Sequence, residues 1–325
     1  MSEPVSAGSG ASHGVHGVHA VHGVLVVDKP IGPTSHDVVR QVRRALRTRA
    51  VGHAGTLDPM ASGVLVLGIG EGTKLLQHLT GADKSYVTTI RLGSETDSLD
   101  AQGSVTATAP VPTPLTLADV AQVAAGFRGE LLQRAPEISA IKVDGERLYA
   151  RARRGEQVVA PERRVVVHEL EVLTVDGPDI RLRVRCSKGF YVRALARDLA
   201  AALGTLGHLT QLRRTHSGAF GLEEALDGAL LKEQPIEAAA RARVGLLPLS
   251  AALRDCPRCV LTAAGVEEVR HGRPVRPEHV DDPASALALA PGQQPIALVD
   301  ASGALRALGR AEADRVVVIR GMAQA

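Results

Sequence analysis

Residues 52–74 read GHAGTLDPMASGVLVLGIGEGTK, and the interpretation of the whole chain starts from them. Two glycines among the first four residues let the backbone approach another group closely. Asp58 precedes Pro59, which favours an extended conformation at Asp58 over a helical one. Small residues at 61–63 leave space in front of its carboxylate, and an apolar strand follows directly. Such a carboxylate is a candidate nucleophile or general base, although these local features equally fit an aspartate that caps or turns the chain.

The glycines Gly68, Gly70 and Gly72 also invite comparison with phosphate-binding loops. The spacing of a P-loop is absent, and the third glycine comes one residue too early for a dinucleotide fingerprint. We therefore expect these glycines to end the apolar strand and to open a helix. A nucleotide-dependent α/β enzyme is the weakest of the interpretations considered.

Periodicity on both sides of this stretch predicts a domain of mixed α and β structure. A strand is expected at 23–29, and an amphipathic helix follows Ser35, with apolar residues at helical spacing and arginines on its other face. Alternating β-branched residues predict strands at 84–92, 163–175 and 179–193. Helices are expected at 117–127, capped by Thr116, and at 193–203.

The chain has 325 residues, which exceeds what one hydrophobic core usually organises, so two domains are expected. Residues 1–22 form a His/Gly-rich tail. We expect this tail to be disordered and not to form a metal site, because the glycines between its histidines give them no fixed geometry for a metal ion. A large domain is expected at 23–250, with a polar and basic excursion at about 134–161. Residues 251–325 predict a small β-rich domain, with a turn at 300–303.

Charge and composition limit the possible classes of protein. The net charge is only +3, but arginines cluster at 40–49, 147–154 and 181–197, which fits either a polyanionic partner or solvated helix faces. No apolar run approaches the roughly 20 residues that a membrane helix needs, and the start does not resemble a secretory signal. The three cysteines cannot form an even disulfide framework, and Cys256 and Cys259 are taken as an incidental pair without a metal. These features predict a soluble, cytoplasmic protein.

Residues 52–74 strongly resemble the central motif of the TruB family of tRNA pseudouridine synthases. The resemblance continues in family order across about 23–220, through VDKPIG at 27–32, KSY at 84–86, SAIK at 139–142 with Tyr149, SKGFYVR at 187–193 and LRR at 212–214. Residues from about 255 are less closely similar to a PUA-type RNA-binding domain. The resemblance implies an α+β pseudouridine synthase fold, in which helices flank a central mixed or antiparallel sheet, and a small C-terminal β-rich PUA-like domain.

The resemblance also implies an activity, in which the uridine at position 55 in the T loop of tRNA becomes its C-glycoside isomer without a cofactor. Asp58 is then the nucleophile, with attack at C1′, attack at C6 and a glycal route all left open. Arg193 is expected to pair with Asp58 and to keep it ionised. Tyr86 is expected to stack on the extruded base and to offer its hydroxyl for proton transfer.

The remaining site residues are assigned by the same resemblance. Tyr191 and Leu212 are expected to line the pocket, His53 to fill the space that the base vacates in the RNA, and Lys29 to support the pocket. The basic excursion, with Lys142, Arg147 and Arg151, is expected to lie over the RNA stem-loop.

The expected partner is the tRNA T stem-loop, bound by a monomer without an obligatory protein partner and away from membranes. Two alternatives remain: a guide-RNA-dependent or ribosomal-RNA pseudouridine synthase, and an RNA-binding tRNA folding factor whose catalysis is secondary.

Overall fold

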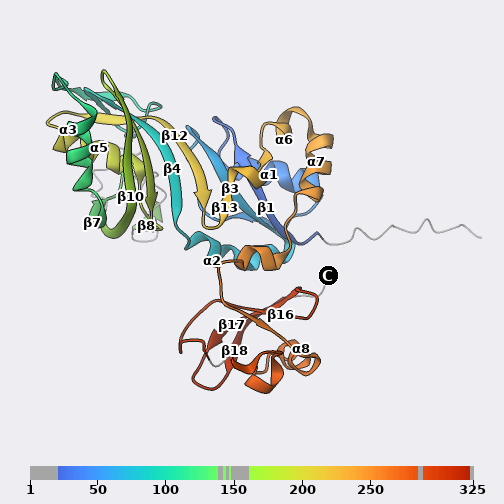
Figure 1. Ribbon diagram of the computed structural model, residues 1–325. Coiled ribbons are helices and arrows are strands. Elements are labelled where there is room, and N and C mark those ends of the chain that lie inside the picture. Colours follow the sequence, from blue (N-terminus) through green and yellow to red (C-terminus); the bar gives the residue numbers. More distant parts are fainter. Residues whose placement is uncertain (1–20, 138–141, 144–145, 148–160, 285–287, 323–325) are drawn as a thin grey trace, which may run out of the picture.

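The computed structural model describes residues 21–137, 142–143, 146–147, 161–284 and 288–322. A ten-stranded mixed sheet dominates it, and a separate four-stranded sheet lies toward the C-terminus (Figure 1). The strands of the large sheet lie in the order β14 (Leu226–Asp227), β1 (Gly23–Lys29), β3 (Ala61–Ile69), β12 (Gly207–Ser217), β4 (Lys84–Leu92), β11 (Asp179–Cys186), β10 (Glu162–Asp176) and β7 (Gly129–Arg134), with β2 (Val51–His53) beside β3 and β13 (Phe220–Gly221) beside β12.

The middle of this sheet brings together segments that are distant in the sequence. β12 runs parallel to β3 and antiparallel to β4, so residues near 212, 62 and 87 become neighbours. The pairs β1–β14 and β3–β12 are parallel, and the other pairs are antiparallel. The fold is therefore the predicted α+β arrangement with a mixed central sheet.

Helices cover the two ends of the large sheet (Figure 1). α3 (Leu117–Ala125) and α5 (Val192–Ala202) lie at the end with β7 and β10, whereas α1 (Ser35–Leu46), α6 (Leu230–Glu233) and α7 (Pro235–Val244) lie near β1. Short helical turns connect strands elsewhere: η1 (Gly70–Leu75), α2 (Leu76–Thr80), η2 (Leu222–Glu224) and η3 (Leu249–Leu253). Two short strands, β5 (Ser94–Thr96) and β6 (Val105–Thr108), pair with each other, as do β8 (Lys142–Val143) and β9 (Glu146–Arg147).

The helix α1 forms where the sequence predicts it. Thr34 caps its start in a capping box with Asp37, and its apolar residues Val38, Val42 and Leu46 are buried. The apolar side therefore faces the core, as the 3.6-residue period requires.

The glycines after β3 allow close packing of the chain. A Cβ on Gly72 would collide with the carbonyl oxygen of Gly23 in β1. Only glycine allows η1 to lie this close to the first strand. The predicted strand end and helical turn are confirmed.

Strand alternation divides the core into two layers. Leu25 and Val27 of β1 face a cluster with α1 and α5, whereas Val24 and Val26 face a second cluster on the opposite side. This second cluster also contains Leu308 and other side chains of the four-stranded sheet. The small sheet therefore shares an apolar core with the back of the large one.

The four-stranded sheet has the order β15 (Arg258–Val260), β16 (Ile296–Val299), β17 (Leu305–Ala311) and β18 (Val316–Gly321), with α8 (Ala263–Arg270) and η4 (Pro277–His279) beside it. Asp300 forms the predicted turn between β16 and β17, because its Oδ1 accepts hydrogen bonds from the backbone N–H groups of Ser302 and Ala304. No described helix is long and apolar enough to cross a membrane.

Candidate active site

A cavity of about 730 Å³ opens across the middle of the large sheet. One wall is the loop that precedes β3, and the floor comes from β4 and β12. The opposite wall comes from the start of β10 and the loop between β11 and α5. Five predicted site residues contribute to its lining, namely Asp58, Tyr86, Tyr191, Arg193 and Leu212.

Asp58 lies in a loop that is fixed from behind. The buried Ser35 hydroxyl accepts a hydrogen bond from the Leu57 N–H at 2.8 Å and donates one to the Leu57 carbonyl at 3.1 Å. Gly63 has φ +105°, and a Cβ there would collide with the Arg214 carbonyl, so a glycine is required after the loop. The Asp58 side chain keeps 34% of its area exposed, which leaves it accessible from the cavity.

Arg193, in the first turn of α5, holds this carboxylate. Its Nε lies 3.0 Å from Asp58 Oδ2, and only 7% of the side chain is exposed. Its Nη1 donates to the Ser98 carbonyl at 2.8 Å and lies 3.7 Å from Asp100 Oδ2. The ion pair expected between Arg193 and Asp58 is therefore present, and a second carboxylate shares the guanidinium.

Asp100 was not expected at the site. It is buried, and its Oδ1 accepts hydrogen bonds from the Ser98 hydroxyl at 2.7 Å and the Gln102 N–H at 3.0 Å. The sequence indicated only a polar loop here, because SETDSLDAQG has the composition of a solvated connection. Nothing local in the sequence shows that this loop folds back onto α5.

Tyr86 lies on β4 and is almost fully buried at the cavity floor. Burial raises the pKa of its hydroxyl, and the Arg214 guanidinium opposes this rise through its charge and a side-chain hydrogen bond. The phenol is therefore protonated at neutral pH and can donate a proton or a hydrogen bond.

Arg214 is the second unexpected residue, although its motif was noticed. It is 1% exposed and donates to the carbonyls of Val64 at 2.6 Å, Gly55 at 3.1 Å and Thr56 at 3.4 Å. Because Gly55 and Thr56 lie just before Asp58, one guanidinium joins the Asp58 loop to β12 and to Tyr86.

Two buried lysines lie near these groups. Burial lowers the pKa of Lys29 to about 8, although the Asp58 charge favours its protonated form. Its Nζ donates to the carbonyls of Pro30 at 2.9 Å and Pro33 at 2.8 Å, so it fixes the turn before α1 and is not among the cavity-lining residues. Burial also lowers the pKa of Lys84 to about 8, and its Nζ donates to two backbone carbonyls.

The other predicted residues divide into two groups. Tyr191 lines the cavity, and its backbone makes two hydrogen bonds with the Gln133 amide, at 2.9 and 3.1 Å. His53 is not a lining residue; its ring lies 5.3 Å from that of His36, and burial lowers its pKa. The backbones of Lys142 and Arg147 pair in the β8–β9 ladder, and their side chains, like all of Arg151, lie outside the described part of the structure.

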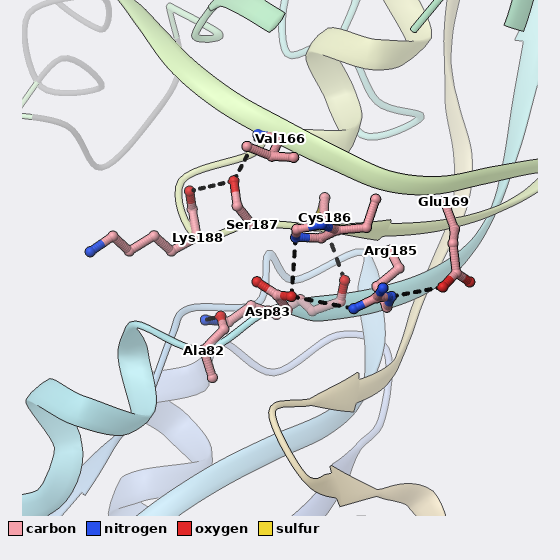
Figure 2. A network of polar contacts seen from close by, with 10 residues as sticks. Ala82, Asp83, Val166, Glu169, Arg185, Cys186, Ser187 and Lys188 are labelled. Atoms are coloured by element: carbon pink, nitrogen blue, oxygen red, sulfur yellow. Dashed lines mark hydrogen bonds and ion pairs between the residues drawn. The ribbon is translucent and has the colours of Figure 1, made fainter. Parts of the chain in front are cut away.

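Polar contacts tie the cavity floor to its far wall (Figure 2). Asp83, just before β4, accepts from Arg185 of β11 at 3.4 Å and lies 3.1 Å from His168 of β10. Ser187 accepts from the Val166 N–H at 2.9 Å, which fixes the start of the wall loop. In the described ranges no group of three or more His, Cys, Asp or Glu side chains is placed to hold a metal ion.

The arrangement offers a carboxylate held by a buried guanidinium, a neutral phenol and the Leu212 side chain beside a cavity of about 730 Å³. Such a set is what the resemblance to pseudouridine synthases, enzymes that isomerise uridine in RNA, predicts. The comparisons agree: the TruB family pseudouridylate synthase N-terminal domain matches residues 43–192, and the tRNA pseudouridylate synthase B C-terminal domain matches 193–254.

Known relatives cover most of the chain. The tRNA pseudouridine synthase B of Mycobacterium sp. strain KMS is 48% identical over 270 residues, covering 82% of this chain and 88% of its own. That of Corynebacterium jeikeium strain K411 is 44% identical over 291 residues, covering 86% and 91%. The chain therefore belongs to the TruB family of pseudouridylate synthases.

Solved structures show the same fold. A chain in an H/ACA RNP bound to a substrate RNA containing 2′-deoxyuridine superposes with a TM-score of 0.70 at 27% identity, covering 93% of this chain and 85% of that one. A chain of the archaeal box H/ACA sRNP Nop10–Cbf5 complex gives a TM-score of 0.69 at 26% identity, covering 94% and 86%.

Proposed function

We propose that this enzyme converts the uridine at position 55, in the T loop of tRNA, to pseudouridine. The observation that carries the proposal is the Asp58 carboxylate, 3.0 Å from a buried guanidinium and open to a cavity. The relatives named tRNA pseudouridine synthase B, at 44–48% identity, support tRNA as the substrate.

Asp58 acts as the nucleophile in this proposal. During the reaction the N1–C1′ bond breaks, the base turns, and C5 bonds to C1′, while the proton lost from C5 is balanced by one gained at N1. The Arg193 guanidinium favours the ionised carboxylate and orients it through Nε. The protonated Tyr86 hydroxyl, at the cavity floor, is proposed to move a proton, and its raised pKa supports this role.

The substrate base must leave the RNA stack before chemistry, which costs a few kcal/mol. Stacking on Tyr86 is worth about 1–3 kcal/mol per base and offsets much of this cost. Tyr191 and Leu212 complete the pocket wall, and Lys29 holds the turn behind Asp58. His53, Lys142 and Arg147 are proposed to contact the RNA outside the pocket, with His53 filling the vacated position.

We further propose that residues 23–250 form the catalytic domain and 251–325 a PUA-like RNA-binding domain. The basic character of the chain up to residue 220 supports a polyanion bound mainly by the larger domain. The enzyme is proposed to act as a monomer in the cytoplasm.

A guide-RNA-dependent enzyme is the second candidate, because the H/ACA structures share the fold. Sequence identity favours the stand-alone enzyme, because this chain is 44–48% identical to the tRNA pseudouridine synthases and 26–27% identical to the H/ACA chains. The two candidates differ in whether the purified protein modifies tRNA without any other component.

The test is to incubate the purified protein with unmodified tRNA and to map pseudouridine at single-nucleotide resolution. We expect one modified position, in the T loop, and none with Asp58→Asn. This variant should bind the same tRNA within a few fold of the wild type, which separates lost chemistry from lost binding. Turnover by Asp58→Asn would refute the nucleophile, and modification only with an added guide RNA would favour the second candidate.

A further inference from the structure

The far wall of the cavity holds an arginine that neither the family motifs quoted above nor the proposed chemistry uses. Arg163 is the second residue of β10 and lines the cavity. Its guanidinium carbon lies 5.6 Å from the centroid of the Tyr191 ring, within the range of a cation–π contact. Its Nε is buried and has no hydrogen-bond partner among the residues that the structure describes.

An unsatisfied buried N–H is costly, so a native structure usually completes it with a water molecule or a ligand. An arginine stacked on a ring keeps its in-plane N–H groups free, and these match the oxygens of phosphate. The position of Arg163 therefore favours an anion that enters through the cavity.

The neighbouring charges favour the same ligand. Arg164 and Lys188 line this wall beside Arg163, and within the described ranges none of the three forms an ion pair with a carboxylate. The acid of this wall, Glu162, lies 3.5 Å from Arg134. By contrast, the deeper arginines of the cavity already have protein partners. The wall thus presents positive charge that the described protein groups leave unneutralised.

We propose that Arg163, with Arg164 and Lys188, forms a subsite for one phosphodiester group of the RNA, next to the extruded nucleotide. The inference rests on the proposed function and deepens it. The Arg163 guanidinium packs over the Tyr191 ring, which is proposed to line the base pocket. A phosphate bound to Arg163 therefore lies at the edge of that pocket. The subsite would fix the backbone of the nucleotide while its base is held between Asp58 and Tyr86.

Binding to a T stem-loop RNA tests the subsite, with Asp58→Asn as the parent so that the RNA stays unconverted. Arg163→Gln should weaken binding about tenfold, as expected for a lost charged hydrogen bond. The slope of log K against log salt should fall by about 0.7, the value for one phosphate of a single strand. Arg163→Lys should keep that slope. The matched control is Arg243→Gln, an exposed arginine of α7 outside the cavity, which should change neither quantity.

A second measurement locates the phosphate. RNAs that each carry one uncharged methylphosphonate should include one whose binding to the parent is weakened about tenfold, and Arg163→Gln should add no further loss with that RNA. If every methylphosphonate effect adds fully to that of Arg163→Gln, the subsite is refuted, even if the wild type forms pseudouridine. If Arg163→Gln does not fold, the same scan with Lys188→Gln decides, because Lys188 is an exposed member of the same subsite: coupling to one phosphate supports the subsite, and full additivity refutes it. Failure of the wild type to modify any tRNA would refute the proposed function separately.

Discussion

At the scale of single residues, the central feature of the site is one arginine that interacts with two carboxylates. Arg193 lies between Asp58 and Asp100, at 3.0 and 3.7 Å, and also donates to the Ser98 carbonyl. The second carboxylate and the carbonyl fix the guanidinium from the side away from the cavity. Asp58 is therefore oriented by a group that is itself held in place, as a preorganised site requires.

The role of Asp100 can be tested by Asp100→Asn, which keeps the shape and removes the charge. Arg193 would lose one anchor, so the Asp58 carboxylate would be less well oriented, and we expect turnover to fall by roughly tenfold or more. The apparent affinity for tRNA should change little, because Asp100 is buried behind the arginine. Single-turnover rates and tRNA binding measure the two effects, and an equal loss in both would argue against a positioning role.

Arg214 carries a different prediction, on stability. Its guanidinium satisfies three backbone carbonyls while fully buried, and a lysine cannot reach all three with one ammonium. We expect Arg214→Lys to lower the free energy of unfolding by about 2 kcal/mol, measured by urea titration. Arg213→Lys is the matched control, because Arg213 makes a more exposed ion pair with Asp28. Equal stability of the two variants would contradict this stabilising role of the Arg214 guanidinium.

The sequence predicts part of this site and misses part of it. Asp58 and Arg193 were recognised as a pair because both lie in family motifs, and the structure brings them together. Asp100 and Arg163 were missed, since one looked like a loop acid and the other like an exposed strand residue. Their partners are distant in the sequence, and only the folded sheet makes them neighbours.

At the scale of elements, the periodic segments were predictable. The helix after residue 34 and the strands β4 and β10 agree with the predictions to within one or two residues. β11 starts as predicted but ends at Cys186, whereas the predicted strand continued to residue 193. The polar segment after β4 was predicted as a plain loop, but it contains β5, which pairs with β6. A three-residue strand has too few alternations to be recognised from sequence.

The start of α1 provides a prediction at this scale. Thr34 caps the helix, and its side-chain and backbone hydrogen bonds lower the pKa of Asp37. Thr34→Ala should cost about 1 kcal/mol of stability at neutral pH, whereas Thr34→Ser should cost much less. Because the Asp37 pKa is lowered on folding, the stabilisation is present above its unfolded value of 3.8 and is lost as pH falls through the folded value. Urea titrations at several pH values measure this, and a cost that grows on acidification would contradict it.

At the scale of the whole molecule, the two sheets are joined by an apolar cluster. Val24 and Val26 of β1 belong to the same buried cluster as Leu308 of β17. The sequence indicated a boundary near 250 from composition, but it contained no sign that the back of β1 would be covered by the small sheet. Packing between distant segments is set by the three-dimensional arrangement and not by local periodicity.

A shared core predicts that the two sheets unfold together. Cys186 is buried in the large sheet and Cys259 in the small one, so the reactivity of each thiol reports its own sheet. In a Cys256→Ser background, pulsed thiol labelling at increasing urea should expose both cysteines at the same midpoint. Leu308→Ala should lower both midpoints, because a buried leucine is worth about 2–5 kcal/mol to the core it belongs to. If Cys259 became reactive at clearly lower urea while Cys186 stayed protected, the cluster would not couple the sheets, and the small sheet would have to be treated as an independently folding unit.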